Sequence, residues 1–173
     1  MIAAHNGRCV HFDETEARPL GRTSTGVRGI NLDEGDYVIG VSCHDPEAED
    51  ASQHQVLVVS ENGFGKRSDP QEYRQTARGA KGVRTLNITE KTGKLVAIKN
   101  VTDADDLMII TRSGITIRMA VDTIRVAGRA TQGVKLINIR EGDEIAAVSV
   151  VAHSDEEETQ AAENQEITEN DNN

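Results

Sequence analysis

The sequence predicts an all-β, propeller-like fold in which one supersecondary unit is used three times. A motif that ends in glycine, valine and a cation recurs in three copies without a gap, and no segment carries a helical period with capping residues. The copies begin at Gly7, Gly63 and Gly114, which are 56 and then 51 residues apart. Each copy holds four short apolar runs separated by turn residues, and four is the strand count of a propeller blade.

The first two strands of each copy are expected on either side of a glycine turn. In the middle copy they span residues 56–60 and 64–68, with Asn62 and Gly63 between them. Asn-Gly tolerates positive φ at both central residues, which a two-residue type I′ hairpin requires. We therefore expect such turns at Asn6-Gly7 and Asn62-Gly63, and the equivalent turn at Ser113-Gly114.

The last two strands of each copy begin at the valine that follows the motif glycine. The third strand is expected at residues 27–32, 83–88 and 134–139, and the fourth at residues 37–42, 95–101 and 145–151. These runs predict three four-stranded blades, at about residues 1–44, 55–102 and 106–151.

Three blades are too few to close a ring, because propellers usually have about four to eight. The chain also begins almost inside the strand that starts at Ile2, which would leave an open sheet edge. We therefore expect the chain to be the C-terminal part of a longer protein.

The blades are expected to end by residue 153, and residues 154–173 form a separate acidic segment. This segment has eight Asp or Glu residues and no Lys or Arg, and it accounts for most of the formal net charge of −10. A polar segment without aromatic residues buries too little apolar surface to offset its ordering entropy. The sequence therefore predicts a disordered acidic C-terminal tail.

Catalytic, metal-binding and membrane functions find no support in the sequence. Phosphate-loop and nucleophile-elbow motifs are absent, the five histidines lack metal-ligand spacing, and no run of about 18 apolar residues occurs. We expect no catalytic residue, no metal site and no cofactor in this chain. Without signal-peptide features, a cytoplasmic protein with no membrane partner is expected.

Two small groups of residues receive structural interpretations. Cys9 and Cys43 lack the CxxC spacing of a zinc or redox site, and both are expected to be small buried hydrophobes. Asp103, Asp105 and Asp106 resemble a carboxylate cluster, but they are expected in a solvated loop between strands. His11 is expected to be solvated or to contact phosphate.

Basic residues recur at four fixed positions in the copies: four, eleven, fifteen and twenty-one residues after the first glycine. The positions are, in that order, His11, Arg67 and Arg118; Arg18, Arg74 and Arg125; Arg22, Arg78 and Arg129; and Arg28, Arg84 and Lys135. Eleven of these twelve residues are Lys or Arg, out of 19 cations in the chain. A randomly solvated surface would not place more than half of its cations in register with a repeat.

Cations at regular intervals suit a long polyanion, because each neutralised phosphate releases counterions without any base being read. Only four residues are aromatic, which argues against stacking on single strands. The sequence therefore predicts salt-sensitive, sequence-nonspecific binding of double-stranded DNA. The candidate contacts are Arg18, Arg22, Arg28, Lys66, Arg67, Arg74, Arg78, Lys81, Arg84, Arg118, Arg125, Arg129 and Lys135.

An alternative stays open for the glycine-rich loops at residues 21–27, 77–83 and 128–134. Glycine permits close approach of a phosphate, and arginine offers a fork of donors. The same residues can instead make the turn and hydrogen-bond loop carbonyls within their own blade. In that case the chain would be a propeller-type protein interaction module.

Three segments resemble successive blade motifs of the C-terminal domain family of the DNA gyrase A protein. They are residues 17–30 (ARPLGRTSTGVRGI), 62–67 (NGFGKR) and 128–134 (GRATQGV). The resemblance covers about residues 1–151, and the acidic tail fits it too. It implies a six-bladed β-pinwheel whose blades exchange strands, with DNA wrapped around a basic rim. This chain would supply the last three blades.

The resemblance also implies a wider setting. The whole protein would be a type II topoisomerase that introduces negative supercoils, with ATP and magnesium used on other domains or subunits. Its partners would be the remainder of the gyrase A protein and the gyrase B protein in a heterotetramer, in the nucleoid-associated cytoplasm. The acidic tail would compete with DNA for the rim. The related C-terminal domain of topoisomerase IV, which usually has fewer or degenerate blades, is the alternative.

Overall fold

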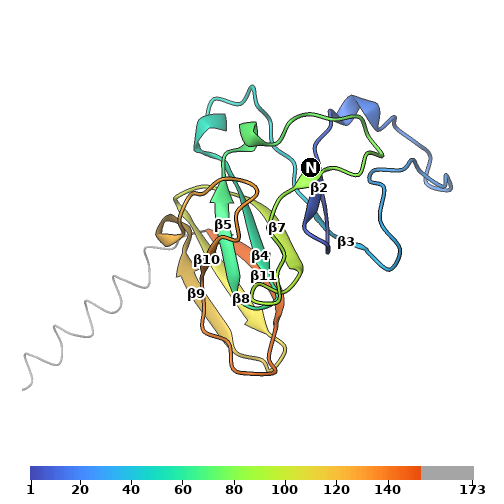
Figure 1. Ribbon diagram of the computed structural model, residues 1–173. Coiled ribbons are helices and arrows are strands. Elements are labelled where there is room, and N and C mark those ends of the chain that lie inside the picture. The colour runs from blue at the N-terminus through green and yellow to red at the C-terminus, as the bar shows by residue number, and fades with distance from the viewer. Residues whose placement is uncertain (153–173) are drawn as a thin grey trace, which may run out of the picture.

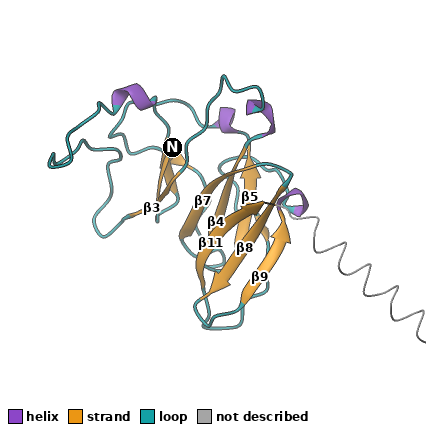
Figure 2. Ribbon diagram, turned by 180° about the vertical axis from the view of Figure 1, so that it is seen from behind, coloured by secondary structure: helices purple, strands orange, loops and turns teal. Residues whose placement is uncertain are grey.

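The computed structural model describes residues 1–152 and shows the predicted all-β fold (Figure 1). The helices among these residues are single 3-10 turns (Figure 2). They are η1 (Glu14–Glu16), η2 (Ala51–Gln53), η3 (Pro70–Glu72) and η4 (Val121–Thr123). The predicted tail, residues 154–173, lies outside the described residues.

The strands form three antiparallel sheets. The first sheet has the order β3 (Val38–Val41), β1 (Ile2–Ala4), β2 (Arg8–Val10) and β6 (Val83–Arg84). The second has the order β10 (Val134–Lys135), β5 (Phe64–Ser68), β4 (Gln55–Ser60) and β7 (Leu95–Val101). The third has the order β11 (Ile145–Ala152), β8 (Asp105–Thr111) and β9 (Thr116–Ala120). First, second and fourth strands are therefore present in each copy, and the bounds predicted for them are met or differ by one residue at an end.

In each of the first two sheets, one edge strand belongs to the following repeat: β6 in the first sheet and β10 in the second. Strand β6 pairs with β2, and β10 pairs with β5. Each exchanged strand is only two residues long, so the expected six-residue third strands were wrong in length. The chain turns inward directly afterwards, because Leu86 and Ile137 enter the cores between blades. Residues 27–32 form no strand, since the described residues hold no sheet on that side for them to join.

Glycine is required where the chain crosses the neighbouring blade to reach the exchanged strand. Gly82 and Gly133 have φ values of 74° and 75°. A Cβ at Gly82 would lie 2.3 Å from the carbonyl oxygen of Cys9, and one at Gly133 would lie 2.4 Å from that of Gly65. The recurring motif glycine therefore marks a close backbone crossing.

The third sheet departs from the expected four-stranded blade. It has three strands within residues 1–152, and no described strand pairs with the outer edge of β9. The reason is the strand exchange itself, because each fourth strand comes from the next repeat and no described repeat follows the third. The four-strand count holds for the first two blades.

The hairpin turns are not of type I′. No residue other than glycine has positive φ in the described chain, so Asn6 and Asn62 are not left-handed. The turn hydrogen bond runs from the Gly7 N–H to the Ala4 carbonyl, which makes His5 and Asn6 the central residues. Gly7 follows this turn with φ of 82°, as in a three-residue loop that ends in a glycine bulge.

The blades pack face to face through two apolar clusters. One joins residues of the first two sheets, including Ala3, Cys9 and Val58, and also holds Tyr73 and Leu86. The other joins the second and third sheets around Leu57, Leu107, Ile109 and Ile137. Strand β7 contacts both β3 and β11. These three edge strands, one from each sheet, therefore lie together on the inner side of the row of blades. The exchanged strands β6 and β10 lie at the opposite, outer edges of their sheets.

The cysteines correct one sequence expectation. Cys9 is buried, and burial raises the pKa of its thiol to about 12, so it behaves as the expected small hydrophobe. Cys43 is exposed, because it follows the end of β3. Among residues 1–152, no helix has the length and apolar character needed to cross a membrane.

Candidate nucleic-acid interface

The cations four residues after the first glycine support the blades. The His11 ring Nδ1 lies 2.7 Å from the carbonyl oxygen of Tyr73, in the next repeat. Arg67 holds the equivalent carbonyl, that of Ile124, through a 2.7 Å hydrogen bond from Nε. Arg67 also pairs with Asp103 and is 5% exposed. His11 is therefore not simply solvated, and Arg67 is enclosed by protein groups.

Arg118 belongs to the same position but lies in the incomplete third blade. Its Nε donates to Asp106 Oδ2 at 2.8 Å. Asp106 is buried, and Asp103 is the partner of Arg67. The three aspartates were expected in a solvated loop, and this is wrong for two of them, because Asp105 and Asp106 begin strand β8. Asp103 and Asp106 also form ion pairs, with Arg67 and Arg118 respectively.

The cations fifteen residues after the first glycine fasten one repeat to the one before it. The Arg129 backbone N–H donates to the Glu72 carboxylate at 2.7 Å, and its Nε donates to the Glu72 carbonyl at 3.0 Å. A terminal guanidinium nitrogen, Nη1, donates to the Arg84 carbonyl. We call this set of contacts the arginine latch.

Arg78 forms the same latch one repeat earlier. It donates to the Glu16 carboxylate and carbonyl at 2.9 and 3.0 Å, and to the Arg28 carbonyl at 2.6 Å. Arg22 occupies the equivalent place in the first repeat, where its side chain is exposed and has no hydrogen bond or ion pair to residues 1–152. The latch forms wherever a preceding blade is described, so it is a contact between blades rather than within one.

Lys66 is the most enclosed of the candidate contacts. Its side chain has no exposed surface, and Nζ donates to the carbonyls of Gly128, at 2.5 Å, and Arg129. Burial, with a contribution from the charge of Arg129, lowers the pKa of this amine to about 8. Lys66, Arg67, Arg78 and Arg129 were expected to contact DNA. Lys66 and Arg67 direct their side-chain donors at protein groups, and Arg78 and Arg129 direct Nε and Nη1 at backbone carbonyls of the preceding repeat. We assign these four residues a structural role.

The two remaining periodic positions face solvent in all three repeats. We call these six residues the outer cations: Arg18, Arg74, Arg125, Arg28, Arg84 and Lys135. Arg84 donates to Asn87 Oδ1 at 3.3 Å, and the other five have no side-chain hydrogen bond or ion pair within residues 1–152. Lys81 is also exposed and pairs with Asp33 at 2.8 Å, a contact that solvent screens. The outer cations are therefore available to an external anion.

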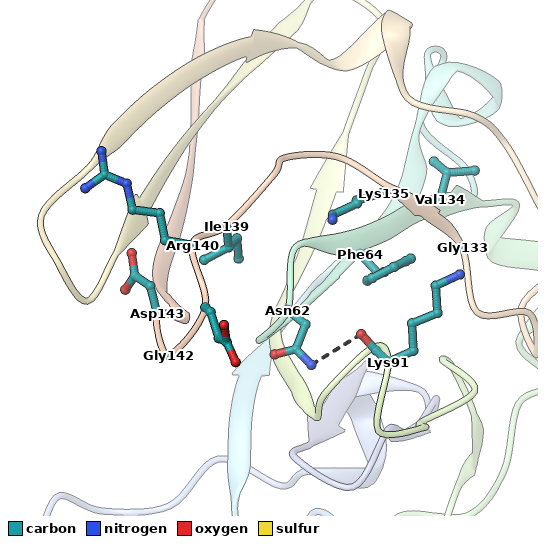
Figure 3. A pocket seen from close by; sticks show the side chains of 11 residues that line it. Asn62, Phe64, Lys91, Gly133, Val134, Lys135, Ile139, Arg140, Gly142 and Asp143 are labelled. Carbon is teal, nitrogen blue, oxygen red and sulfur yellow. Dashed lines mark hydrogen bonds between the residues drawn. The ribbon is translucent and has the colours of Figure 1, made fainter.

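A hollow lies at each junction between blades, beside the exchanged strand. The larger is a cavity of about 570 Å³ whose lining includes Asn62, Phe64, Lys91 and Lys135 (Figure 3). The smaller, of about 200 Å³, is lined by the equivalent turn with Arg8 and by Arg84. Arg8 and Lys91 fall outside the periodic positions, so sequence reasoning missed them. Strand pairing places Arg8 opposite Arg84, and the cavity lining places Lys91 near Lys135, so both line a hollow with a cation of the next repeat.

The titratable residues also bear on metal binding and on shifted pKa values. Within residues 1–152, no cluster of His, Cys, Asp or Glu could hold a metal ion. The pKa of the Asp143 carboxyl is lowered to about 2, and the first cause is the hydrogen bond from Ser113. That contact closes a hairpin turn and does not point to catalysis.

Comparison with known proteins gives a consistent family assignment. Residues 1–45, 54–102 and 105–152 match the family model described as the DNA gyrase C-terminal domain, beta-propeller. The DNA gyrase A protein of Staphylococcus epidermidis is 44% identical over 156 residues, which are 90% of this chain and 17% of that relative. The same protein of Staphylococcus aureus is 44% identical over 159 residues, 92% of this chain and 18% of the relative.

Solved structures show the same fold. The C-terminal domain of DNA topoisomerase IV superposes with a TM-score of 0.80 at 24% identity, over 95% of this chain and 50% of that one. The DNA gyrase A C-terminal domain gives 0.72 at 23% identity, over 86% of this chain and 49% of that one. The chain thus spans less than a fifth of the curated relatives and half of the solved domains. From the family match and the 44% identical relatives, the chain belongs to the DNA gyrase C-terminal domain family.

Proposed function

We propose that this chain binds double-stranded DNA without sequence preference and wraps it along the outer margin of its blades. The observation that carries the proposal is the exposure of the outer cations in all three repeats, while the other periodic cations are largely engaged by protein groups. Arg84 and Lys135 lie on the exchanged strands, at the outer edges of their sheets. A track of separate cations on successive blades suits the phosphate backbone of a curved duplex.

The contact set is smaller than the one the sequence predicts. The outer cations form its centre, and Arg22 and Lys81 are added because their side chains are exposed. Arg118 is ion-paired with the buried Asp106, so we place it at the border of the track. Charge favours these contacts without reading bases, since arginine and lysine bind phosphate through donors alone.

We further propose that the chain is the non-catalytic wrapping part of a gyrase that introduces negative supercoils. The whole enzyme would join it to the rest of the gyrase A protein and to the gyrase B protein in a heterotetramer in the cytoplasm, with ATP and magnesium used elsewhere. The relatives at 44% identity are gyrase A proteins, which supports gyrase over topoisomerase IV.

Binding is tested by fluorescence anisotropy with two labelled duplexes of unrelated sequence over a series of salt concentrations. The triple variant R18Q/R74Q/R125Q should bind both duplexes more weakly and equally so. The slope of log K against log salt should become shallower by roughly three, at about 0.9 for each lost phosphate contact.

The matched control is K94Q/K99Q/R112Q, which removes the same charge outside the periodic positions. Its slope should stay close to that of the unchanged chain. If both triple variants behave alike, position on the blades does not matter and only net charge does. If neither changes the slope, the cations are structural and the interaction-module alternative is favoured.

Wrapping is tested separately from binding. Nicked plasmid is ligated in the presence of the chain, and the change in linking number is read on a gel. A shift that grows with protein concentration supports wrapping, whereas binding without any shift restricts the proposal to straight DNA.

A further inference from the structure

The register of the first exchanged strand places two like charges directly opposite each other. Arg8 of β2 is the Cα partner of Arg84 of β6. Both residues are exposed, and each guanidinium makes one hydrogen bond, from Arg8 to the Gly82 carbonyl at 3.2 Å and from Arg84 to Asn87. Like charges directly opposite in a ladder destabilise a sheet. The fold alone therefore gives no reason for this pair.

Two cations also lie near each other where β10 joins the second sheet, but they come from other positions of the repeat than Arg8 and Arg84. Lys135 of β10 is the partner of Phe64 in β5, and the Lys91 ammonium lies 5.3 Å from the centre of the Phe64 ring (Figure 3). Phe64 is 7% exposed and lines the same hollow as both lysines. Neither ammonium group has a hydrogen bond or ion pair to any other described residue. The two lysines therefore share this hollow, and neither ammonium group is ion-paired with a carboxylate.

Both pairs face the hollows beside the exchanged strands. The first hollow is lined by Arg8 and Arg84, and the second by Lys91 and Lys135. Glu141 and Asp143 also line the second hollow. The Asp143 carboxylate accepts hydrogen bonds from the Ser113 N–H at 3.1 Å and hydroxyl at 2.6 Å, whereas Glu141 is exposed and makes no side-chain hydrogen bond or ion pair to residues 1–152. Asp143 is therefore engaged at the hairpin turn of the third blade, and neither carboxylate forms an ion pair with Lys91 or Lys135, so both ammonium groups are available to an external anion.

We propose that each junction between blades is a phosphate clamp, in which one DNA backbone phosphate binds between two cations from adjacent repeats. The clamps are Arg8 with Arg84 and Lys91 with Lys135. This inference rests on the proposed DNA binding and adds Arg8 and Lys91 to the contacts. A bound phosphate turns the repulsion within each pair into two attractive, charge-assisted contacts. Because each clamp needs a strand from the following repeat, DNA binding depends on the exchange of strands.

The test compares R8Q and K91Q with the unchanged chain in the anisotropy series. Each variant should make the salt slope shallower by about 0.9, the loss of one phosphate contact. R8Q should also keep or raise the melting temperature at low ionic strength, since it removes a like-charge pair. A residue needed only for folding would lower the melting temperature instead.

Two further variants make the outcome unambiguous. R8K keeps the charge and should retain the slope of the unchanged chain, which shows that a folded clamp needs a cation at this position. K94Q removes a lysine from the same turn as Lys91 but outside the cavity lining, and should leave the slope unchanged.

Each alternative result has a distinct reading. If R8Q and K91Q bind like the unchanged chain, or if K94Q loses as much slope as K91Q, the clamps are wrong while DNA binding stands. A lower melting temperature for R8Q makes Arg8 structural and overturns the first clamp. If the unchanged chain fails to bind either duplex at low salt, the proposed function and the clamps are both wrong.

Discussion

At the scale of single residues, two arginines of one loop differ in role because only one of them has backbone carbonyls within hydrogen-bond distance. Arg125 and Arg129 are four residues apart, yet Arg125 faces solvent and Arg129 donates to Glu72 and to two carbonyls of the preceding repeat. A guanidinium in contact with several fixed acceptors stabilises a junction, whereas one in water is free to bind an anion.

The first prediction separates these two roles. R129Q should lower the free energy of unfolding by about 2 kcal/mol, because the Arg84 and Glu72 carbonyls lose charged donors. R125Q should change it by less than about 0.5 kcal/mol, as expected for an exposed residue, but should weaken DNA binding. Urea unfolding and anisotropy measure the two effects. Equal stability of the two variants would remove the latch as a stabilising contact.

The second prediction concerns pH and Lys66. Its pKa is about 8 in the folded chain and near the ordinary value of 10.5 in the unfolded chain. Between these values the unfolded state binds more protons, so the stability contributed by Lys66 rises as pH increases from about 8 to 10.5. The rise should be roughly 3 kcal/mol.

The comparison is with K66M, in which this titration is absent. The difference in unfolding free energy between the unchanged chain and K66M is measured at intervals across this range. It should grow with pH, because the neutral amine keeps both carbonyl contacts without the cost of a buried charge. A difference that stays constant would show that Lys66 remains charged when folded.

At the scale of elements, the two-residue exchanged strands depend on contacts beyond their ladders. Strand β10 has only two partners in β5. Around it, Gly133 crosses closely over Gly65, Ile137 enters the core between blades, and Arg129 closes the latch. The strand exchange is therefore a cooperative feature of the junction rather than a property of the strand sequence.

The third prediction tests the close crossing. G133A should lower the unfolding free energy by about 3 kcal/mol, since it combines a left-handed backbone with a Cβ placed against the Gly65 carbonyl. G142A is the control: its φ is also positive, but no atom lies within 4 Å of the added Cβ. It should cost only about 1 kcal/mol, from the backbone alone. Equal losses would mean that the crossing adds nothing.

At the scale of the whole molecule, opposite charges are separated along the chain. Residues 154–173 carry eight acids and no Lys or Arg, so the formal charge of the remaining chain is −2 rather than −10. The blades, by contrast, repeat cations on their outer margin. We therefore expect the acidic segment and DNA phosphates to compete for the same positive charges.

The fourth prediction follows from this competition. Removing residues 154–173 should tighten binding to duplex DNA at low salt, and the gain should shrink as salt screens the charges. A chain of full length with the eight acids replaced by Gln or Asn should show the same gain, which separates charge from length. Anisotropy titrations measure both, and unchanged affinity in both variants would show that the segment does not compete.

The repeat, the all-β class and most strands could be predicted from the sequence alone, because glycine turns and apolar runs are local signals. The periodic cations were also visible there, and the family resemblance implied strand exchange. The turn type was predicted wrongly, because Gly7 rather than Asn6 supplies the positive φ that the hairpin needs.

Which cations face outward could be learned only from the folded arrangement of the repeats. From periodicity alone, Arg74 and Arg78 are both predicted to contact DNA. In the structure, Arg78 donates to the carbonyls of Glu16 and Arg28, which lie far away in the sequence. The partnership of Arg8 with Arg84 likewise exists only because a strand of one repeat completes the sheet of another. The environment of a charge is set by neighbours that the fold brings together, and no local pattern records them.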